Sequence, residues 1–206
     1  MAANPTPLRR RPVQQRSAAR VERMLEACAT LIDELGYDGV TTTLIADRAG
    51  VAVGSLYQFF PDKRAVVQAL TARNLDRFMD HVAQRMAGAT MAHWWDAVDL
   101  VFDAYVEMFR SVPGFTQIRF GDVVDLRLMD EQRDNNTVIA DRLVELLAEY
   151  FHLPRAELSL PISVAVEASD GILNLAFRRK LFTEDVVIAE AKRVVRGYLT
   201  GHLERG

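Results

Sequence analysis

The sequence has few of the features that define several common classes of protein. Its 206 residues include a single cysteine, Cys28, which excludes an intrachain disulfide, and no Cys-x-x-Cys pair that could hold zinc. The four histidines are too scattered to suggest a metal site. No stretch approaches the roughly 18 uninterrupted apolar residues of a membrane span, and no apolar segment follows the first arginines as in a secretory signal. The sequence therefore predicts a cytoplasmic protein with no membrane segment, no metal and no cofactor.

Sequence motifs of common enzyme classes are also missing. The chain contains no HExxH, no GxSxG, no Walker loop and no GxGxxG, and its acidic residues follow no catalytic pattern. We therefore expect no catalytic residues and no enzymatic activity.

The formal net charge of −3 conceals a basic N-terminal segment on an acidic chain. Residues 1–23 hold six arginines and one acidic residue, a balance of +5, whereas residues 65–206 hold 16 basic and 21 acidic side chains, a balance of −5. A charge split between the two ends of a chain indicates a polyanionic partner for the basic end.

Apolar residues recur at helical spacing along most of the chain, and the seven prolines lie in the N-terminal segment or at apparent breaks between these stretches. A first helix is predicted from Ser17, a possible N-cap, to Gly36, with an apolar face that ends at Leu35. A long helix is predicted after Asp62, its possible N-cap, and ends at Gly88. At about 1.5 Å per residue it could span two domains.

Four further helices are predicted in the remainder of the chain, over residues 93–109, around 138–150, over 158–179 and over 183–203, the last capped by Thr183. An acidic stripe lies opposite the apolar face of the first of these, and we interpret it as a solvated face. Its members are Asp96, Asp99, Asp103 and Glu107. Because no stretch alternates in the manner of a strand, the predicted fold class is all-α.

Residues 40–63 predict two short helices joined by a tight turn. Thr42 or Thr43 can cap the first helix, and Gly50 suits the left-handed residue that ends it. The side chain of Val51 is expected to pack into the core and so hold the turn in place. The inward-facing residues of the first helix are predicted to be Ile45, Ala46 and Ala49.

The second short helix, over about residues 53–60, is too short to be stable alone and must be held by packing of Leu56 and Phe60. Its opposite face is what a recognition helix presents to a DNA major groove. That face is predicted to comprise Val53, Ser55, Tyr57, Gln58 and Phe59.

These segments together resemble the N-terminal helix-turn-helix of the TetR family of transcriptional repressors. The resemblance rests on LGYDGVTT, IADRAGV and LYQFFPDK, in that order, and covers roughly residues 17–70. It implies an all-α homodimer that binds double-stranded DNA at an inverted-repeat operator and is released by a small effector. The implied division is a disordered basic arm over 1–16, a helix-turn-helix domain over 17–62, and a linker helix with an effector-binding and dimerisation domain over 63–206.

The resemblance also implies roles for single residues of the helix-turn-helix. Thr42, Tyr57 and Lys63 match positions that hold DNA phosphates, and Ser55 and Gln58 match positions that touch bases or nearby backbone. The physical chemistry agrees, because hydroxyls and a lysine at a helix start bind phosphate, and glutamine can pair with N6 and N7 of adenine. The predicted DNA-binding positions are completed by Thr43, Val53 and Gly54.

The sequence departs from the family pattern at three positions. Ala52 stands where the family often places a serine or threonine that caps the recognition helix, and the loss of that cap should cost about 1 kcal/mol of local stability. Val53 and Phe59 stand where polar or basic side chains are frequent, so they offer only apolar contact. Val53 can meet a thymine methyl group. Phe59 has no donor for the usual phosphate contact, for which the arginines of the N-terminal segment can compensate.

Arg9, Arg10 and Arg11 form the basic arm. Their Pro- and Gln-containing surroundings have little to bury, so we expect the arm to be disordered without DNA and to follow a minor groove or the backbone when DNA is bound. The alternative is a solvated tail with no role.

Aromatic residues concentrate in the C-terminal part of the chain, and most of them must form its core. A subset matches where members of the family build their effector pocket, and we expect it to bind a small, largely lipophilic molecule. The candidate effector-binding residues are Trp94, Phe102, Tyr105, Phe109, Phe115, Arg119, Phe120 and Asn174.

The last two predicted helices carry more apolar and small residues than one small domain needs, and a two-fold interface would use them. These residues include Ala165, Ala168, Ile172, Leu175, Val187, Val194 and Tyr198. Packing against the long linker helix is the alternative use. An alternative also stays open for function: a DNA-binding protein of the same fold that activates transcription, or that responds to a protein partner.

Overall fold

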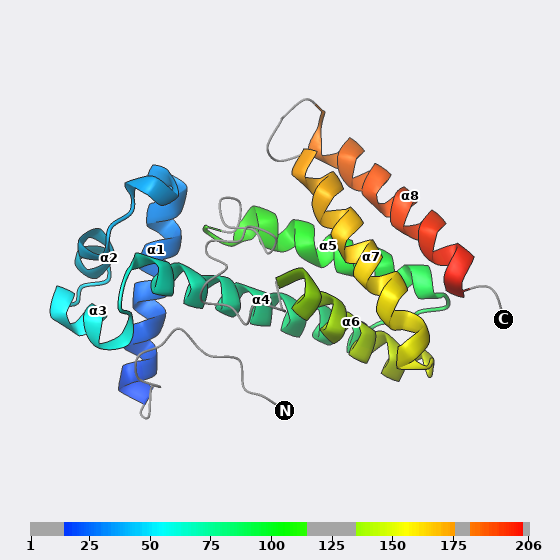
Figure 1. The fold of residues 1–206 in the computed structure, drawn as a ribbon, viewed down its shortest axis with the longest axis horizontal. Helices are drawn as coiled ribbons and strands as arrows, with labels where there is room; N and C mark the ends of the chain where they lie inside the picture. The colour runs from blue at the N-terminus through cyan, green and yellow to red at the C-terminus, as the bar shows by residue number, and fades with distance from the viewer. Residues whose placement is uncertain (1–14, 115–134, 176–181, 204–206) are drawn as a thin grey trace. The chain divides into compact units, whose positions relative to one another are not determined.

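The structure, a computed structural model, describes residues 15–114, 135–175 and 182–203, and every regular element within these ranges is a helix (Figure 1). The predicted all-α class is therefore confirmed for this part of the chain. The helices are α1 (Gln15–Gly39), α2 (Thr42–Arg48), α3 (Val53–Phe59), α4 (Lys63–Gly88), α5 (Trp94–Ser111), α6 (Asn135–Phe151), α7 (Arg155–Asn174) and α8 (Glu184–Leu203).

The helices form two compact units, each with its own core. Of the described residues, the first unit comprises 15–76 and 111–114, and the second comprises 77–110, 135–175 and 182–203. The sequence placed the corresponding boundary at residue 62. The division falls further along because the first half of α4 packs into the core of the first unit through Val66, Val67 and Leu70.

Helix α1 differs from its prediction at both ends. It begins at Gln15, so Ser17 lies inside the helix and is not its N-cap. Gly36 interrupts the regular helix with φ +71°, as its predicted role as helix terminator requires. Leu35 is 51% exposed and does not belong to the buried face, because the tightly packed part of α1 ends at Ile32.

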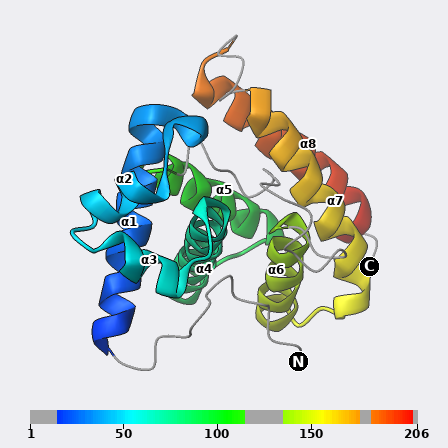
Figure 2. The ribbon, with the colours of Figure 1, turned by 60° about the vertical axis from the view of Figure 1, so that its left-hand side comes forward.

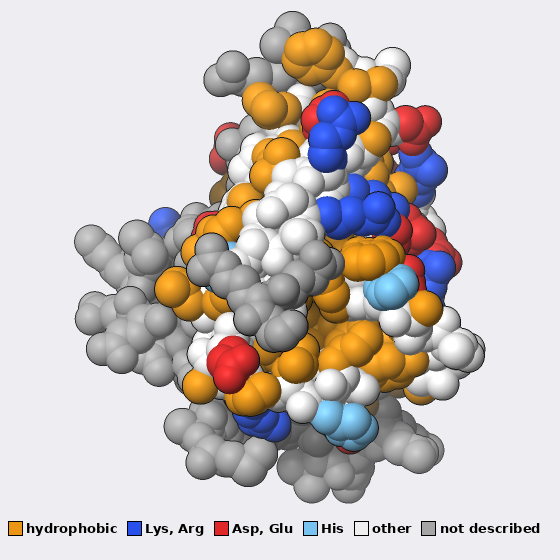
Figure 3. All heavy atoms as spheres, turned by 90° about the vertical axis from the view of Figure 1, so that its right-hand side faces the viewer, with side chains coloured by type: hydrophobic (Ala, Val, Ile, Leu, Met, Phe, Trp, Pro, Cys, Tyr) orange, Lys and Arg blue, Asp and Glu red, His pale blue; other side chains and the backbone are white. Residues whose placement is uncertain are grey.

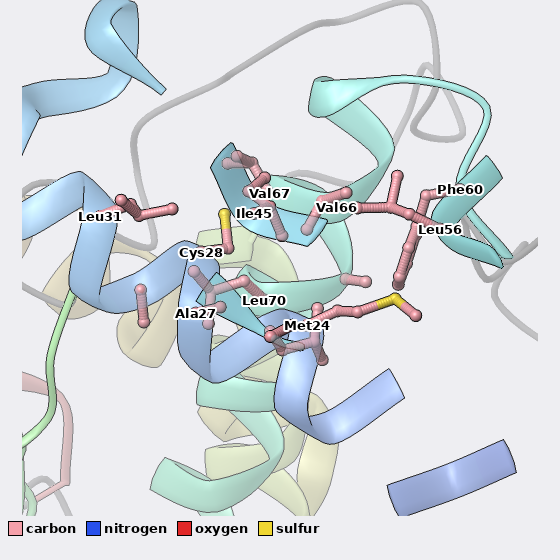
Figure 4. Packing of buried hydrophobic residues seen from close by; sticks show 14 of the residues in the cluster. Met24, Ala27, Cys28, Leu31, Ile45, Leu56, Phe60, Val66, Val67 and Leu70 are labelled. Carbon is pink, nitrogen blue, oxygen red and sulfur yellow. The ribbon is translucent and has the colours of Figure 1, made fainter. Parts of the chain in front are cut away.

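The core of the first unit gathers side chains from all four of its helices (Figure 4). Cys28 of α1 lies close to Ile45 of α2, and Met24 of α1 extends toward Leu56 and Phe60, which close the core from the side of α3. The predicted inward positions of the two short helices are thus confirmed. This core is what holds α2 and α3, which are each only seven residues long, in a fixed arrangement.

The thiol of Cys28 is fully buried in this core, and burial raises its pKa to about 12. We expect no reaction of the native protein with a thiol-specific disulfide reagent at pH 8, because only the thiolate attacks and almost none is present. Spectrophotometric thiol titration checks this, with the protein in denaturant as the control that should react fully. Rapid stoichiometric labelling under native conditions would contradict the buried, protonated thiol.

The raised pKa also makes the stability of the first unit depend on alkaline pH. The unfolded chain loses this proton from about pH 9, the ordinary pKa of the group, whereas the folded chain keeps it until about pH 12. The free energy of unfolding is therefore unaffected by this thiol below about pH 9. It falls as the pH rises from about 9 to about 12, because the unfolded chain loses the proton that the folded chain keeps.

In the second unit the acidic stripe of α5 is exposed or half-buried, as the sequence interpretation expected, but its side chains also have partners that the sequence did not indicate. Asp103 accepts from Lys192 of α8 at 2.6 Å, and Lys192 lies 3.6 Å from Asp99, which also pairs with Arg196. These acids thus align α5 with α8, although pairs this exposed contribute on the order of 1 kcal/mol or less each.

The other two members of the stripe are also engaged. Glu107 Oε2 lies 3.1 Å from His81 Nε2 and 3.2 Å from Arg85 Nη1, both on α4. Asp96 accepts from the backbone amides of Ala92 and His93 at 2.9 and 3.0 Å and so holds the N-terminus of α5. The sequence could not reveal these partners because most of them lie on other helices.

Helices α4, α7 and α8 begin near their predicted starts. Asp62 Oδ1 accepts from the amide of Ala65 at 2.9 Å, which confirms the predicted cap of α4. Helix α8 follows Thr183 directly, also as predicted. Helix α7 begins at Arg155 and contains Pro161, which was expected at a break. The helix tolerates this proline by giving up the single hydrogen bond that its missing N–H would make.

None of the helices in the ranges that the structure describes is long and apolar enough to cross a membrane.

Candidate nucleic-acid interface

A short, well-formed turn fixes α2 against α3 (Figure 2). Gly50 adopts φ +64°, and its amide donates to the carbonyl of Asp47 at 3.0 Å. The amide of Val51 donates to the carbonyl of Ala46 at 2.9 Å, and the Val51 side chain packs on the core. These two hydrogen bonds make the helix ending in which a left-handed glycine is preferred, as the sequence predicted.

Helix α2 is capped by Thr41, not by Thr42 or Thr43 as expected. The hydroxyl of Thr41 accepts from the amide of Leu44 at 3.2 Å, the geometry in which an N-cap oxygen satisfies the third helical amide. Three consecutive threonines precede Leu44, and the backbone conformation decides which of them becomes the cap. Because Thr41 takes that role, the hydroxyl of Thr42 is available for another contact.

That contact joins the two predicted phosphate-binding hydroxyls. Thr42 Oγ1 lies 3.0 Å from the hydroxyl of Tyr57, so the start of α2 is hydrogen-bonded to α3 at the protein surface. Tyr57 is 42% exposed, and Thr42 is half-buried. The pair presents two hydroxyl groups in a fixed position, which suits recognition of a phosphate oxygen.

Helix α3 divides into a buried side and an exposed side. Gly54, Tyr57 and Gln58 are exposed, and Ser55 is half-buried. Val53 is partly buried against the core, so only part of its side chain is available for contact.

Phe59 does not belong to the exposed side of α3, contrary to the sequence prediction. It is only 7% exposed and is a member of the core of the first unit. It therefore joins Leu56 and Phe60 in anchoring α3. Packing in the core alone accounts for an apolar residue at this position, and no contact with DNA is needed to explain it. Ala52 makes no side-chain capping bond, as expected from its missing hydroxyl.

Lys63, at the start of α4, is held by the end of α1. Its Nζ donates to the carbonyl oxygen of Tyr37 at 2.9 Å and lies 4.2 Å from the centre of the Tyr37 ring. No local sequence pattern indicates this pair, since 26 residues separate its members. A lysine ammonium has three protons, so this arrangement positions the charge and still leaves donors for an anion.

A second basic side chain of the first unit, that of Arg48, is already engaged within the unit. Arg48 of α2 donates to both carboxylate oxygens of Glu34 of α1, at 3.0 and 2.8 Å. Hydrogen bonding by Arg48 holds the pKa of Glu34 below its ordinary value. This ion pair ties α2 to α1 and supports the position of the threonines at the other end of α2.

The predicted effector-binding residues fall only partly in the described ranges. Phe102 is buried, whereas Trp94, Tyr105 and Phe109 are half-buried on α5. Tyr105 meets Phe78 of α4 edge to face, with ring centres 6.3 Å apart.

The N-terminus of α5 carries an aromatic cluster. Trp94 packs edge to face on Trp95 at 5.7 Å, and Trp95 stacks on His93 at 4.0 Å. The hydroxyl of Tyr150 of α6 donates to the carbonyl of Ala89 at 2.9 Å and accepts from the amide of Met91 at 3.2 Å. This bridge, which the sequence did not indicate, fixes the turn that leads into the cluster.

Several predicted site residues lie outside the described part of the chain. They are the arm residues Arg9, Arg10 and Arg11, the effector candidates Phe115, Arg119 and Phe120, and the side chain of Asn174, the last residue of α7. Within the described ranges, no group of three or more His, Cys, Asp or Glu side chains could hold a metal ion.

Comparison with known proteins gives two family matches that together cover most of the chain. Residues 24–70 match the family described as "Bacterial regulatory proteins, tetR family", and residues 92–203 match "Tetracyclin repressor-like, C-terminal domain". The second match alone covers more than half of the chain. It also includes α5–α8, where the resemblance seen in the sequence rested only on length and helix count.

Individual proteins agree with these matches. A crystal structure of a TetR-family transcriptional regulator from Streptomyces coelicolor is 38% identical, with a TM-score of 0.77, over 89% of this chain and 99% of the other. The transcriptional repressor KstR of Rhodococcus jostii is 40% identical over 58 residues, 28% of this chain and 27% of that repressor, so the chain spans about a quarter of that relative's length.

The same fold occurs in AibR, solved in complex with isovaleryl coenzyme A and operator DNA, at 18% identity and a TM-score of 0.55 over 85% of this chain and 97% of that one. The two family matches and the helix-turn-helix geometry agree with each other. The chain belongs to the TetR family of bacterial transcriptional regulators.

Proposed function

We propose that this regulator is a repressor that binds an inverted-repeat operator as a homodimer and is released by a small, largely apolar effector. The observation that carries the DNA-binding part is the Thr42–Tyr57 hydroxyl pair, 3.0 Å apart and directly beside the exposed Gln58. Hydroxyl groups that bind phosphate and an amide side chain that reads a base edge are thereby placed on one surface.

Positioning and reading fall to different residues in this proposal. Lys63, Thr42 and Tyr57 contact phosphates and fix the register of α3, whereas Gln58 pairs with a base edge, with Ser55 beside it. Phosphate contacts are blind to sequence and depend strongly on salt, while a base contact discriminates between sequences and changes the salt dependence little.

The substitution Lys63→Ala should weaken binding to operator and to scrambled DNA alike, and should reduce the salt slope by about one unit because one fewer counterion is released. Gln58→Ala should cost about 1 to 3 kcal/mol on the operator only, with nearly the same slope. Tyr57→Phe should weaken binding to both DNAs equally, as Lys63→Ala does, but should leave the salt slope unchanged. The measurement is binding of each variant to both DNAs across a salt series.

Thermal unfolding of the same variants is the control for this experiment, since Lys63 also holds the carbonyl of Tyr37. An equal loss of affinity on both DNAs for Gln58→Ala, or an altered base preference for Lys63→Ala, would show that these roles are assigned wrongly.

The homodimer is supported by apolar stripes on α7 and α8. These two helices pack on each other, and each also carries apolar side chains at four- or eight-residue spacing on its exposed side. Figure 3 shows hydrophobic side chains exposed among charged ones on one face of the second unit. The exposed residues are Leu160 (69%), Val164 (39%), Val186 (54%) and Val194 (46%).

A second copy of the chain is the occupant that fits these stripes. Exposed apolar stripes on two adjacent helices can pair with the same stripes of a copy related by a two-fold axis, which buries all four helices in one contact. In a two-fold dimer, the two copies of α3 would each read one half of an inverted repeat. Not all of the expected interface residues contribute, because Ala165 and Val187 are buried within the unit.

The effector site is proposed along α5, whose half-buried aromatic residues offer apolar contact with Tyr105 as a polar group. A protein of the same fold binds isovaleryl coenzyme A, so this fold can hold an acyl thioester.

A panel of lipophilic compounds that includes short- and long-chain acyl-coenzyme A thioesters should contain one that changes tryptophan emission, because Trp94 and Trp95 lie at the start of α5. The same compound should raise the unfolding temperature and release DNA, since it binds one state of the protein better than the other. Emission titration and DNA binding with each compound are the measurements. If no compound shifts emission or unfolding temperature, the proposed site loses its support.

A further inference from the structure

Gly54 of α3 is a glycine that the fold of the chain does not require. A Cβ atom built on Gly54 has no other atom within 4 Å, so no neighbour excludes a side chain there. The positive-φ glycines among the described residues are Gly36, Gly50 and Gly114, and Gly54 is not one of them. By contrast, position 114 requires a glycine for two reasons. Its φ is +76°, and a Cβ atom built there would lie 3.0 Å from the Cα of Ala29.

The glycine is unfavourable for the helix in which it lies. Helix α3 has only seven residues, and its N-cap residue Ala52 makes no side-chain capping bond. A helix this short depends on every local preference, and glycine is the poorest helix former after proline because it loses the most backbone freedom. Local stability therefore favours almost any other residue at position 54, and the fold of the chain gives no reason for the glycine.

The position of Gly54 suggests a reason for it. Gly54 precedes Tyr57 by three residues and Gln58 by four, so the three lie on one face of α3. All three are exposed, while Leu56 and Phe59 anchor the opposite face in the core. Gly54 is also the member of this face nearest the N-terminus of α3, the end at which recognition helices come closest to the bases.

We propose that Gly54 determines specificity by letting the backbone of α3 lie directly against base-pair edges in the major groove. This inference rests on the proposed DNA-binding function. A methyl group at position 54 would hold the helix away from the groove floor by about 1.5 Å, the length of one carbon–carbon bond. Hydrogen bonds tolerate only about 0.5 Å of variation in length, so Gln58 would lose its base while the flexible phosphate contacts adjust.

The experiment compares Gly54→Ala with Gly88→Ala on two duplexes, one selected from random DNA by the wild-type protein and one scrambled. Gly88 is the matched control, since it is an exposed helical glycine of α4 with equally open space around it. Gly54→Ala should lose about tenfold or more on the selected duplex, the range of one lost base contact, and less than about twofold on the scrambled one. Gly88→Ala should bind both duplexes like the wild type.

Two further readouts separate this role from a structural one. Gly54→Ala, and Gly54→Ser as a second variant, should unfold at a temperature no lower than the wild type, since the helix gains propensity. Adding Gln58→Ala to Gly54→Ala should cause little further loss, because the glutamine contact is already broken.

The possible results distinguish the inference from the function on which it rests. If the wild type selects no sequence from random DNA, the proposed function fails and the inference fails with it. If the wild type selects a sequence but Gly54→Ala binds it as tightly, or loses equally on both duplexes, the proposed function stands and the role of Gly54 is overturned.

Discussion

The double variant Val164→Asp/Val194→Asp is expected to be a folded monomer that binds the inverted repeat 10² to 10⁴ times more weakly than the wild type. Val164 and Val194 are exposed members of the α7 and α8 stripes, so aspartate should leave the isolated chain folded but places like charges in the proposed contact between copies. The loss follows because one half-site binding event no longer raises the local concentration of the other, an advantage of about 10² to 10⁴.

Sedimentation velocity at micromolar concentration and operator titration together check this expectation. Ala87→Asp, which adds one such charge at an exposed position of α4, is the control and should remain dimeric. A double variant that still sediments as a dimer would move the interface away from these stripes.

Replacing Arg9, Arg10 and Arg11 together by alanine is expected to lower DNA affinity about a hundredfold at about 0.15 M salt. It should also reduce the salt slope by nearly three units, since each phosphate neutralised by an arginine releases about 0.9 counterion. Operator binding across a salt series is the measurement.

The reason for so large an effect is the charge of the folded part of the first unit. Residues 15–76 carry seven basic and eight acidic side chains, a balance of −1. Arg48 and Arg73 are already paired with Glu34 and Glu22. Helices α1–α3 and the start of α4 thus offer a shaped surface with little positive charge, and the arm supplies what is missing.

The triple replacement of the same arginines by lysine is the control and should keep most of the salt slope, because it keeps the charge. An unchanged slope in the alanine variant would mean that the arm stays in solvent when DNA is bound.

The part of the site that sequence could predict is the part set by local chemistry. Gly50 must be left-handed for the tight turn, Asp62 is the one good cap before α4, and Leu56 and Phe60 have no other place than the core. Each conclusion needs only the residues within one helical turn on either side.

The features that the sequence could not predict depend on backbone geometry and on contacts between residues far apart in the chain. Any of three threonines could have capped α2, and the entry angle of the chain selected Thr41. Phe59 lies at the border between the two sides of α3, where packing and contact with a partner look alike in a sequence. The partners of Asp99 and Asp103 lie about 90 residues further along the chain, beyond any local pattern.

The buried Cys28 has a practical consequence for experiments on this regulator. Because the only native thiol is protonated and enclosed in the core, the wild-type chain already serves as a background for site-directed labelling. A cysteine introduced at an exposed position of α3 or α8 would take up a spin label or fluorophore at that one site without replacement of the native residue. Distances between labels on paired chains could then be followed as DNA and effector are added, in a protein whose own core remains unaltered.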